Sequence, residues 1–396
     1  MTRTLEQLAE QTWDAVVGGA GPAGALAARE LARRGGAVLL VDRATFPRGK
    51  VCGCCLNRWA LTTLRTVGLG ELTQRGGAVP LTAVRLATGG RQALVPLPEG
   101  AALSRERFDA ALVDAAVQAG AVFLPGTRAA LARTSRDRQG AAVPSPTRRV
   151  ELHQVKARAE VAARVVLAAD GLGGTLLAGE PDLHARPRAG SRIGAGVIAA
   201  EAPCFYEPGT VFMACGHGGY AGLVRLEDGR LDVAAALDPA LVRQAGGPGK
   251  GVEAILQEAR FPPVPGLADL PWRGTPALTR AAARLAGHRL LVLGDAAGYI
   301  EPFTGEGIAH ALASAAHLAP LAARACRRWT PALGREWAQL HRRLIARRQR
   351  LCRVIAAALR RPELMRVLIG LLAWAPLLAW PLTCRLNMAA RGVAPS

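Results

Sequence analysis

A glycine-rich turn between an apolar strand and a helix constrains the fold of this chain more than any other feature. Residues 14–17 are typical of a short buried strand, and Ala23–Arg34 has the periodicity of a helix. The turn between them reads Gly19-Ala-Gly21-Pro-Ala-Gly24. Gly19 permits the tight bend, Gly21 lets a pyrophosphate approach the backbone, and Gly24 lets helix and strand pack closely. Because free amides at the start of the helix face the phosphates, the segment predicts a βαβ unit that binds a dinucleotide.

A second strand and an acidic residue complete this pattern. Residues 37–41 are apolar and end at Asp42, eighteen residues after Gly24, where a carboxylate can accept both hydroxyls of a ribose. Further along, a helix is expected at 108–119, and apolar strands are expected at 161–169 and 289–293. These elements indicate an α/β domain built on a parallel sheet that is covered on both faces.

A second glycine motif follows the strand at 289–293, about 270 residues after the first. It reads Gly294-Asp-Ala-Ala-Gly-Tyr-Ile-Glu-Pro-Phe-Thr-Gly-Glu-Gly-Ile308. Asp295 comes directly after the buried strand and can bind a polyol hydroxyl. Gly305 and Gly307 place backbone amides at a helix start, where the positive end of the helix dipole stabilises the negative charge of a reduced flavin. NAD enzymes do not need this element, so the two motifs together predict FAD.

These motifs give the chain a resemblance to a known family. It resembles the geranylgeranyl reductase family, within the wider class of flavoproteins built like p-hydroxybenzoate hydroxylase. The matching pieces span roughly residues 13–325 and are Gly19 to Gly24, Asp42-Arg43, Phe46 to Gly53, Ser104 to Asp109, Ala169 to Gly171 and Gly294 to Ile308.

The resemblance implies a set of cofactor-binding residues. It places Arg105 near the FAD phosphates or adenosine, Asp295 on the ribitol chain, and Arg48 to Cys52 beside the isoalloxazine. It places Asp170 in a strand–turn that contacts both the cofactor and the domain packing. The full expected set is Gly19, Gly21, Gly24, Asp42, Arg43, Arg48, Arg105, Asp170, Gly294, Asp295, Gly305, Gly307 and Ile308.

Two residues are candidates for catalysis. The family usually has glycines after Cys52-Gly53, whereas this chain has Cys54 and Cys55. Cys52 can donate a proton if Arg48 or Lys50 lowers its pKa; the alternative is a set of buried or pocket-lining thiols without chemistry.

Tyr220 is the second candidate. With His217, it belongs to a segment, Gly216–Arg230, that resembles the family's strand pair across the flavin. The two side chains are therefore expected to line the substrate pocket, and the alternative for Tyr220 is a core tyrosine. The cysteines near Cys52 have no second Cys/His cluster to complete a tetrahedral site, so no metal is predicted.

The strand pattern changes after about residue 189, where short strands are separated by turns, with a hairpin expected at Asp228-Gly229. The expected architecture is α/β: a discontinuous Rossmann-like FAD-binding domain, an inserted, mainly antiparallel substrate domain, and a helical C-terminus. The expected bounds are 13–80, 101–180 and 280–325 for the FAD-binding domain, 81–100 and 181–279 for the substrate domain, and 326–396 for the helical region. Residues 133–149 are expected to form a loop.

The charge of the chain is concentrated near the C-terminus. The net charge is +20, and residues 324–361 hold twelve arginines and a single acid, Glu336. An apolar stretch at 367–383, interrupted by Pro376 and Pro381, follows. This pattern suits attachment to an anionic membrane surface; the alternatives are a helical cap packed on the domain and a membrane span. Nucleic acid is not an expected partner, because aromatic residues are only 4% and zinc-finger spacing is absent.

The N-terminal residues 1–13 lack an apolar signal core, and eight cysteines in 396 residues do not make a disulfide framework. The expected location is therefore the cytoplasm, including the inner face of the membrane. The expected reaction passes hydride from NAD(P)H through FAD to a C=C bond of an apolar, isoprenoid-like substrate. One alternative is a monooxygenase that hydroxylates an aromatic, quinone or polyketide-like substrate. Another is a non-catalytic protein that binds a lipid or a partner. A halogenase is disfavoured, because its Trp-x-Trp-x-Ile-Pro motif has no counterpart here.

Overall fold

The computed structural model describes residues 4–132, 145–301, 303, 305–381 and 383. Its first sheet has eight strands, five of them parallel, in the spatial order β20-β11-β1-β2-β8. The parallel strands are β1 (Thr12–Gly18), β2 (Val38–Val41), β8 (Val122–Leu124), β11 (Arg158–Ala168) and β20 (Leu290–Val292). The antiparallel strands β9 (Arg128–Leu131), β10 (Arg148–His153) and β19 (Ala286–Gly287) extend it. All four residues of β2 are buried, as expected for a strand covered on both faces.

Helices cover one face of this sheet. Those that pack there are α2 (Pro22–Ala32), α3 (Arg58–Thr66), α5 (Arg105–Gln118) and α8 (Gly307–Arg327). Pro22 stands in the first turn of α2, where its missing N–H leaves no bond unmade. The rest of α2 is buried and rich in alanine, which lets α8 and α5 pack closely against it.

The second sheet has seven strands in the order β17-β13-β16-β15-β14-β5-β6. They are β5 (Ala83–Thr88), β6 (Arg91–Pro96), β13 (Ile193–Ala199), β14 (Thr210–Gly216), β15 (Gly219–Arg225), β16 (Leu231–Leu237) and β17 (Arg273–Ala277). Every pair is antiparallel except β14 with β5. The hairpin expected at Asp228-Gly229 joins β15 to β16, with Gly229 at a φ of 84°.

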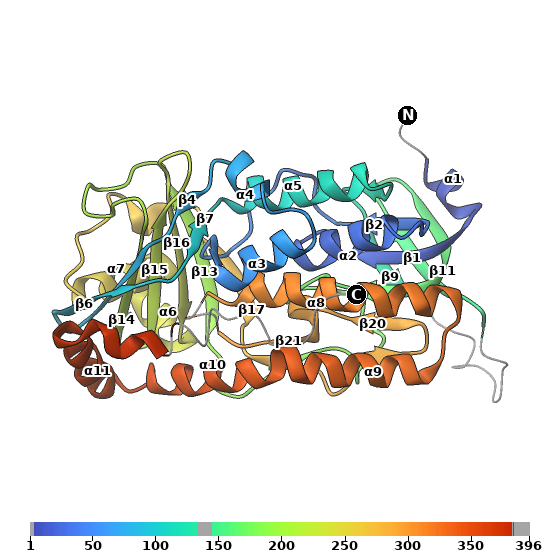
Figure 1. Cartoon of the computed structure of the whole chain (residues 1–396). Coiled ribbons are helices and arrows are strands. Elements are labelled where there is room, and N and C mark those ends of the chain that lie inside the picture. The colour runs from blue at the N-terminus through green and yellow to red at the C-terminus, as the bar shows by residue number, and fades with distance from the viewer. Residues whose placement is uncertain (1–3, 133–144, 302, 304, 382, 384–396) are drawn as a thin grey trace.

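Helices α6 (Pro239–Ala245) and α7 (Pro248–Glu258) lie beside this second sheet, and α7 packs on one of its faces. The two sheets lie at opposite ends of an elongated molecule, with α3 and α5 reaching between them (Figure 1). Small sheets fill the middle: β3 (Cys55–Asn57), β4 (Val79–Pro80) and β7 (Gly100–Ala102) form one, and β12 (Arg186–Pro187), β18 (Arg280–Ala281) and β21 (Gly298–Tyr299) form the other. The remaining short helices are α1 (Leu5–Ala9), α4 (Leu72–Arg75) and the 3₁₀ turns η2 (Leu267–Asp269) and η3 (Gly294–Ala297). The expected α/β class, with a mainly antiparallel second sheet and a helical C-terminus, is confirmed.

The C-terminal helices run back along the whole molecule (Figure 1). They are α9 (Pro331–His341), a π-helical turn η4 (Arg342–Ala346), α10 (Arg347–Ala358), α11 (Pro362–Trp374) and the 3₁₀ turn η5 (Pro376–Ala379). The indole of the buried Trp337 anchors α9 by donating a hydrogen bond to the carbonyl of Val292, 2.9 Å away. At the far end, α11 packs on β5 and β6.

One expectation needs correction. The loop expected at 133–149 ends earlier, because Arg148 and Arg149 belong to β10; residues 133–144 lie outside the described part. The apolar stretch at 367–383 is interrupted near Pro376, as noted from the sequence: α11 ends at Trp374 and η5 begins at Pro376. No helix in the described residues is both long enough and apolar enough to cross a membrane.

Candidate functional site

The first glycine turn has the geometry that its sequence requires. Gly19 has a φ of 100°, and its amide donates a 2.7 Å hydrogen bond to the carbonyl of Val41. A Cβ on Gly24 would lie 1.8 Å from the carbonyl oxygen of Gly19, so only glycine lets α2 sit this close to the turn. Gly21 differs from both: a Cβ there would meet only guanidinium nitrogens, Arg48 Nη2 at 3.7 Å and Arg105 Nη2 at 4.0 Å. The space over Gly21 is therefore open and bordered by cations.

Asp42 is fastened to the same turn. Its Oδ2 accepts the amide of Ala20 at 2.7 Å, and its Oδ1 accepts the amide of Ala44 at 2.8 Å. The carboxylate thus joins the end of β2 to the glycine turn, while each oxygen keeps a further acceptor site for a ribose hydroxyl. The exposed Arg43 reaches to 3.8 Å from a Cβ position on Gly173, at the edge of this region.

Positive charge exceeds negative charge around Gly21. Arg105 is nearly buried and binds Asp109 through two hydrogen bonds of 2.8 and 2.7 Å, and Arg48 lies 3.2 Å from the same carboxylate. The ammonium of Lys50 interacts with these groups and with Asp295. The cations Arg48, Arg105 and Lys50 therefore outnumber the carboxylates of Asp109 and Asp295. A pyrophosphate supplies the missing negative charge, so these residues fit the phosphates of FAD.

The second glycine motif lies directly against the first. A Cβ on Gly294 would come within 2.7 Å of the Cβ of Ala23, in the first turn of α2. The Gly294 amide donates to the Ser314 hydroxyl at 3.2 Å, which ties η3 to α8. Two segments about 270 residues apart therefore meet at one place, as the sequence predicts for a shared cofactor.

The start of α8 is built from the remaining motif residues. Gly305 has a φ of 67°, Gly307 begins the helix, and Ile308 is buried beneath it. A Cβ on Gly307 would lie 3.5 Å from the ring of Tyr299. Gly307 is therefore half-buried, in ordinary contact with an aromatic ring beside the free amides of the helix start.

Asp170 and Asp295 line one depression, together with Arg280 and His184. Asp170 Oδ2 accepts the amide of Leu176 at 2.9 Å, so this carboxylate also holds its own turn. Asp295 makes no such local bond in the described residues, which leaves its carboxylate available to a ligand.

The loop of residues 48–55 lies between the two domains. Its Cys52 side chain interacts electrostatically with the guanidinium of Arg105. Its Val51 touches the second sheet, because a Cβ on Gly196 would lie 3.0 Å from Val51 Cγ1. The face of the sheet that meets this loop carries a row of small residues across neighbouring strands: Gly196, Ala234 and Gly222, followed by Met213.

Asp232 flanks this row, two residues before Ala234 on β16. Its side chain interacts with the nearby Cys54 thiol, and its Oδ2 has no hydrogen-bond partner in the described residues. Burial raises the pKa of Asp232 to about 8, against the opposing effects of Cys54, Arg105 and Arg230. Burial likewise raises the pKa of Cys54, and the nearby Asp232 adds to this shift.

Asp232 is not among the site residues predicted from the sequence. The sequence does contain an indication of its role. Asp232 is the single acidic residue in the apolar strand Leu231–Leu237, and it lies at the same alternating positions as Ala234 and Ala236, so it belongs to the same face of the strand. An acid on the buried face of a strand is a candidate for function.

Tyr220 flanks the same row on the opposite side, two residues before Gly222 on β15. It is buried, its ring packs edge-on against Phe303 at 5.1 Å, and its hydroxyl has no partner in the described residues. Burial, with a contribution from Glu301, raises its pKa. Arg192, itself buried, holds Glu301 at 3.4 Å beside this ring.

His217 lies apart from this space. Its side chain is exposed, and its Nδ1 lies 2.8 Å from a carboxylate oxygen of Glu258. No cluster of three or more His, Cys, Asp or Glu side chains suited to a metal occurs in the described residues.

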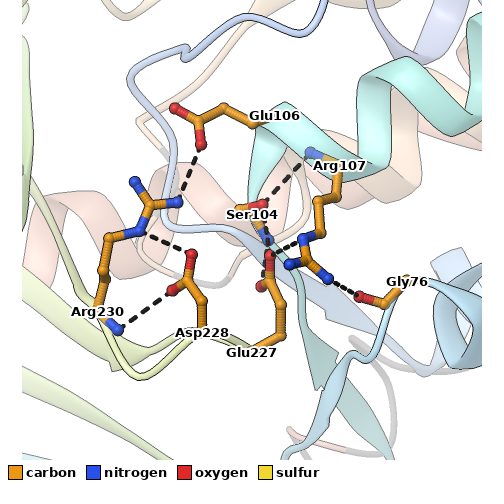
Figure 2. A network of polar contacts seen from close by, with 7 residues as sticks. All are labelled: Gly76, Ser104, Glu106, Arg107, Glu227, Asp228 and Arg230. Atoms are coloured by element: carbon orange, nitrogen blue, oxygen red, sulfur yellow. Dashed lines mark hydrogen bonds and ion pairs between the residues drawn. The ribbon is translucent and has the colours of Figure 1, made fainter.

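A polar network fastens the β15–β16 hairpin to the start of α5 (Figure 2). The carboxylate of Glu227 accepts hydrogen bonds from Ser104 and pairs with Arg107 at 3.3 Å. Arg230 pairs with Glu106 at 2.9 Å and with Asp228 at 2.7 Å. The network adjoins the site, because Arg105 follows Ser104 and Asp232 lies two residues after Arg230.

Comparison with known proteins agrees with this geometry. Residues 12–179 match the family model for the FAD binding domain. Menaquinone reductase of Mycobacterium tuberculosis is 37% identical over 127 residues, which cover 29% of this chain and 29% of that protein. Menaquinone reductase of Mycolicibacterium smegmatis is 26% identical over 314 residues, covering 76% of this chain and 73% of that one.

Solved structures share the fold. A geranylgeranyl bacteriochlorophyll reductase-like protein from Thermoplasma acidophilum superposes with a TM-score of 0.74 at 18% identity, covering 95% of this chain and 98% of that one. A flavin-dependent brominase superposes with a TM-score of 0.76 at 15% identity, covering 97% and 96%. Together, the matches indicate an FAD-dependent oxidoreductase.

Proposed function

We propose that this protein reduces a C=C bond in an apolar, isoprenoid-like substrate, with NAD(P)H as the electron donor and FAD as the carrier. The observation that carries the proposal is the row of small residues opposite Val51, flanked by the buried side chains of Asp232 and Tyr220. A row of small side chains, set beside the expected flavin loop, suits a flat or elongated apolar molecule. Relatives named menaquinone reductase support an isoprenoid quinone as the first substrate to test.

The cofactor would be held by the two glycine motifs. Arg48, Arg105 and Lys50 would neutralise its pyrophosphate over Gly21, and Asp295 would bind the ribitol. The start of α8 would stabilise negative charge on the ring system through its free amides. When bound, FAD would take a hydride from NAD(P)H and pass it to one carbon of the substrate double bond.

The protein must then supply a proton to the other carbon. We assign this task to Cys52, in the loop between the two domains, with Asp232 as a nearby group that holds a proton at neutral pH. In the balanced reaction one hydride and one proton add across C=C, and NAD(P)H leaves as NAD(P)⁺. Tyr220 bounds the substrate space from the side opposite Asp232.

The test is anaerobic turnover. The purified holoprotein is reduced with NADPH or NADH without oxygen, then mixed with menaquinone or with a geranylgeranylated lipid. The proposal expects flavin reoxidation and a product that stays two hydrogens heavier after any quinol in it has been reoxidised to the quinone in air. The absence of anaerobic turnover, combined with an oxygen-dependent hydroxylated product, would assign the protein to the monooxygenases instead. FAD binding without reduction by either donor, and without turnover, would leave a non-catalytic binding protein.

A further inference from the structure

Helix α11 carries apolar side chains on two opposite faces. On the inner face Met365, Ile369 and Leu372 pack against the second sheet, with Met213 and Tyr220 in the same cluster. This face alone accounts for the attachment of the helix to the protein. The outer face is also largely apolar, and no other part of the described chain packs on it.

The outer apolar surface continues from α11 into η5. Trp374 is 86% exposed and Leu377 is 72% exposed, although both are large apolar side chains. The surface, called here the α11 patch, consists of Leu364, Val367, Leu368, Leu371, Trp374, Leu377, Leu378 and Trp380. Isolated exposed apolar residues are common, whereas eight of them within one helix and its following turn indicate a surface that binds something.

A row of arginines leads to this patch along α10. Arg347, Arg350 and Arg353 are exposed at the helical spacing that places them on one side of α10. In this region the ion pairs within the described residues involve other arginines, Arg348 with Glu306 and Arg360 with Asp238. Figure 1 shows α9 and α10 along one edge of the molecule, with α11 at the end of that edge. Within the described residues, unpaired exposed arginines on α10 therefore precede an apolar patch with exposed tryptophans on α11 and η5.

We propose that the α11 patch and the α10 arginines form a docking surface for an anionic lipid bilayer. The apolar side chains enter the interface between headgroups and acyl chains, and the arginines bind lipid phosphates. Charge complementarity favours this occupant over a second copy of the chain, because two copies with a net charge of +20 would repel each other. The inference stands on surface residues alone and does not depend on the proposed reaction.

The test uses vesicles and the full-length holoprotein. Vesicles of phosphatidylglycerol and phosphatidylcholine in equal parts are compared with vesicles of phosphatidylcholine alone by flotation. Wild type should float with the anionic vesicles, and raised salt should weaken this binding without abolishing it, because the apolar contribution is not screened.

Two variants separate the two contributions. Combined Leu371→Ser, Trp374→Ser and Leu377→Ser should lower partitioning into anionic vesicles by at least about ten-fold. Combined Arg347→Gln, Arg350→Gln and Arg353→Gln should lower it by about ten-fold or more and remove the preference for phosphatidylglycerol. Both should keep the FAD content and circular dichroism of wild type, since none of the six residues packs on the core.

Matched controls use exposed residues elsewhere. Val155→Ser removes a fully exposed valine, and Arg128→Gln with Arg158→Gln removes exposed positive charge from the opposite end of the molecule. These controls should bind vesicles like wild type. Equal binding by the α11 variant, or equal losses in the controls, would overturn the proposal. So would light scattering that shows a dimer which the α11 variant converts to a monomer, with no vesicle binding by either.

Discussion

Glu227 accepts two hydrogen bonds from Ser104, one from the amide at 2.9 Å and one from the hydroxyl at 2.7 Å (Figure 2). The glutamate belongs to the β15–β16 hairpin of the second domain, and the serine caps α5 of the first. The side chain of Glu227 is 1% exposed, so water does not compete for these two hydrogen bonds. The contact sets how Arg105, one residue into α5, faces the second sheet.

Glu227→Ala should therefore destabilise the whole molecule. It removes the partner of the Ser104 amide and leaves Arg107 without its carboxylate, a loss of roughly 2–4 kcal/mol in the free energy of unfolding. Urea unfolding measures it. The matched control is Asp228→Ala, on the same hairpin, whose carboxylate pairs only with Arg230 and which should cost about 1 kcal/mol or less. Equal losses in the two variants would show that the contact does not join the domains.

Gly21→Val should abolish FAD binding while the protein still folds. The φ of −72° at Gly21 suits any residue, and the new side chain would meet only Arg48 and Arg105, but it would fill the space that the phosphates need. Gly24→Val should instead disrupt folding, because the Cβ of the valine would collide with the carbonyl of Gly19. Flavin content and circular dichroism of both variants distinguish a blocked site from a broken fold. Normal FAD content in folded Gly21→Val would remove the basis of the first site.

Asp295→Ala should weaken FAD binding with little change in the stability of the apoprotein. Loss of one hydrogen-bonded ligand contact should raise the Kd by about five- to more than a hundred-fold, or roughly 1–3 kcal/mol. Asp170→Ala is the comparison, because Asp170 holds the amide of Leu176 and its loss should lower the melting temperature of the apoprotein itself. Flavin fluorescence titration and apoprotein melting separate the two. Full retention of flavin by Asp295→Ala after dialysis would contradict its assignment.

Cys52→Ser should slow only the step that needs substrate. Loss of a positioned acid typically slows proton transfer by about 10²–10⁴-fold. Flavin content and reduction by NAD(P)H should stay unchanged, because neither requires this proton. Stopped-flow absorbance follows the two half-reactions, with Cys55→Ser as the control from the same loop. Wild-type rates in both half-reactions would show that Cys52 only packs in the structure, where it contributes about 1 kcal/mol to the free energy of unfolding.

Asp232→Asn should flatten the dependence of stability on pH. The pKa of Asp232 is raised from 3.8 to about 8, so the folded state keeps a proton that the unfolded state releases. Its contribution to stability is therefore complete below about pH 4 and is lost as pH rises towards 8, by at most roughly 1.4 kcal/mol for each pH unit. Urea unfolding of wild type and Asp232→Asn across this range measures the difference. Parallel curves would show that Asp232 is ionised in the folded protein at neutral pH.

The sequence allowed the cofactor motifs to be predicted because their requirements are local. Gly19 and Gly24 are needed by the turn itself, and the sequence shows a turn directly. Asp232 could not be found in this way, since its importance depends on which face of β16 meets the loop of Cys54. The interaction of Cys52 with Arg105 could not be predicted from the sequence either. Arg105 lies far along the chain, and the two residues come together only when α5 packs against the loop.

The C-terminal region shows a different limit of sequence analysis. The positive charge and the apolar stretch of this region can be read from the sequence. A stripe of apolar residues on a helix, however, does not by itself indicate whether protein or lipid covers it. In α11 the sheet covers one stripe and leaves the other bare, a division that depends on the position of β6. The break in the helix before Pro376, by contrast, follows from the missing amide of proline and was foreseeable.

The packing of α11 on the second sheet also has a consequence for folding during translation. Met213 and Tyr220, in the middle of the second sheet, share an apolar cluster with Leu359, Met365 and Ile369. Translation reaches those partners about 140 residues after Tyr220. The sheet is therefore synthesised long before its cover, and its apolar face is open to water or to chaperones throughout that interval. Helix α11 thus supplies the last-synthesised side chains of this apolar cluster.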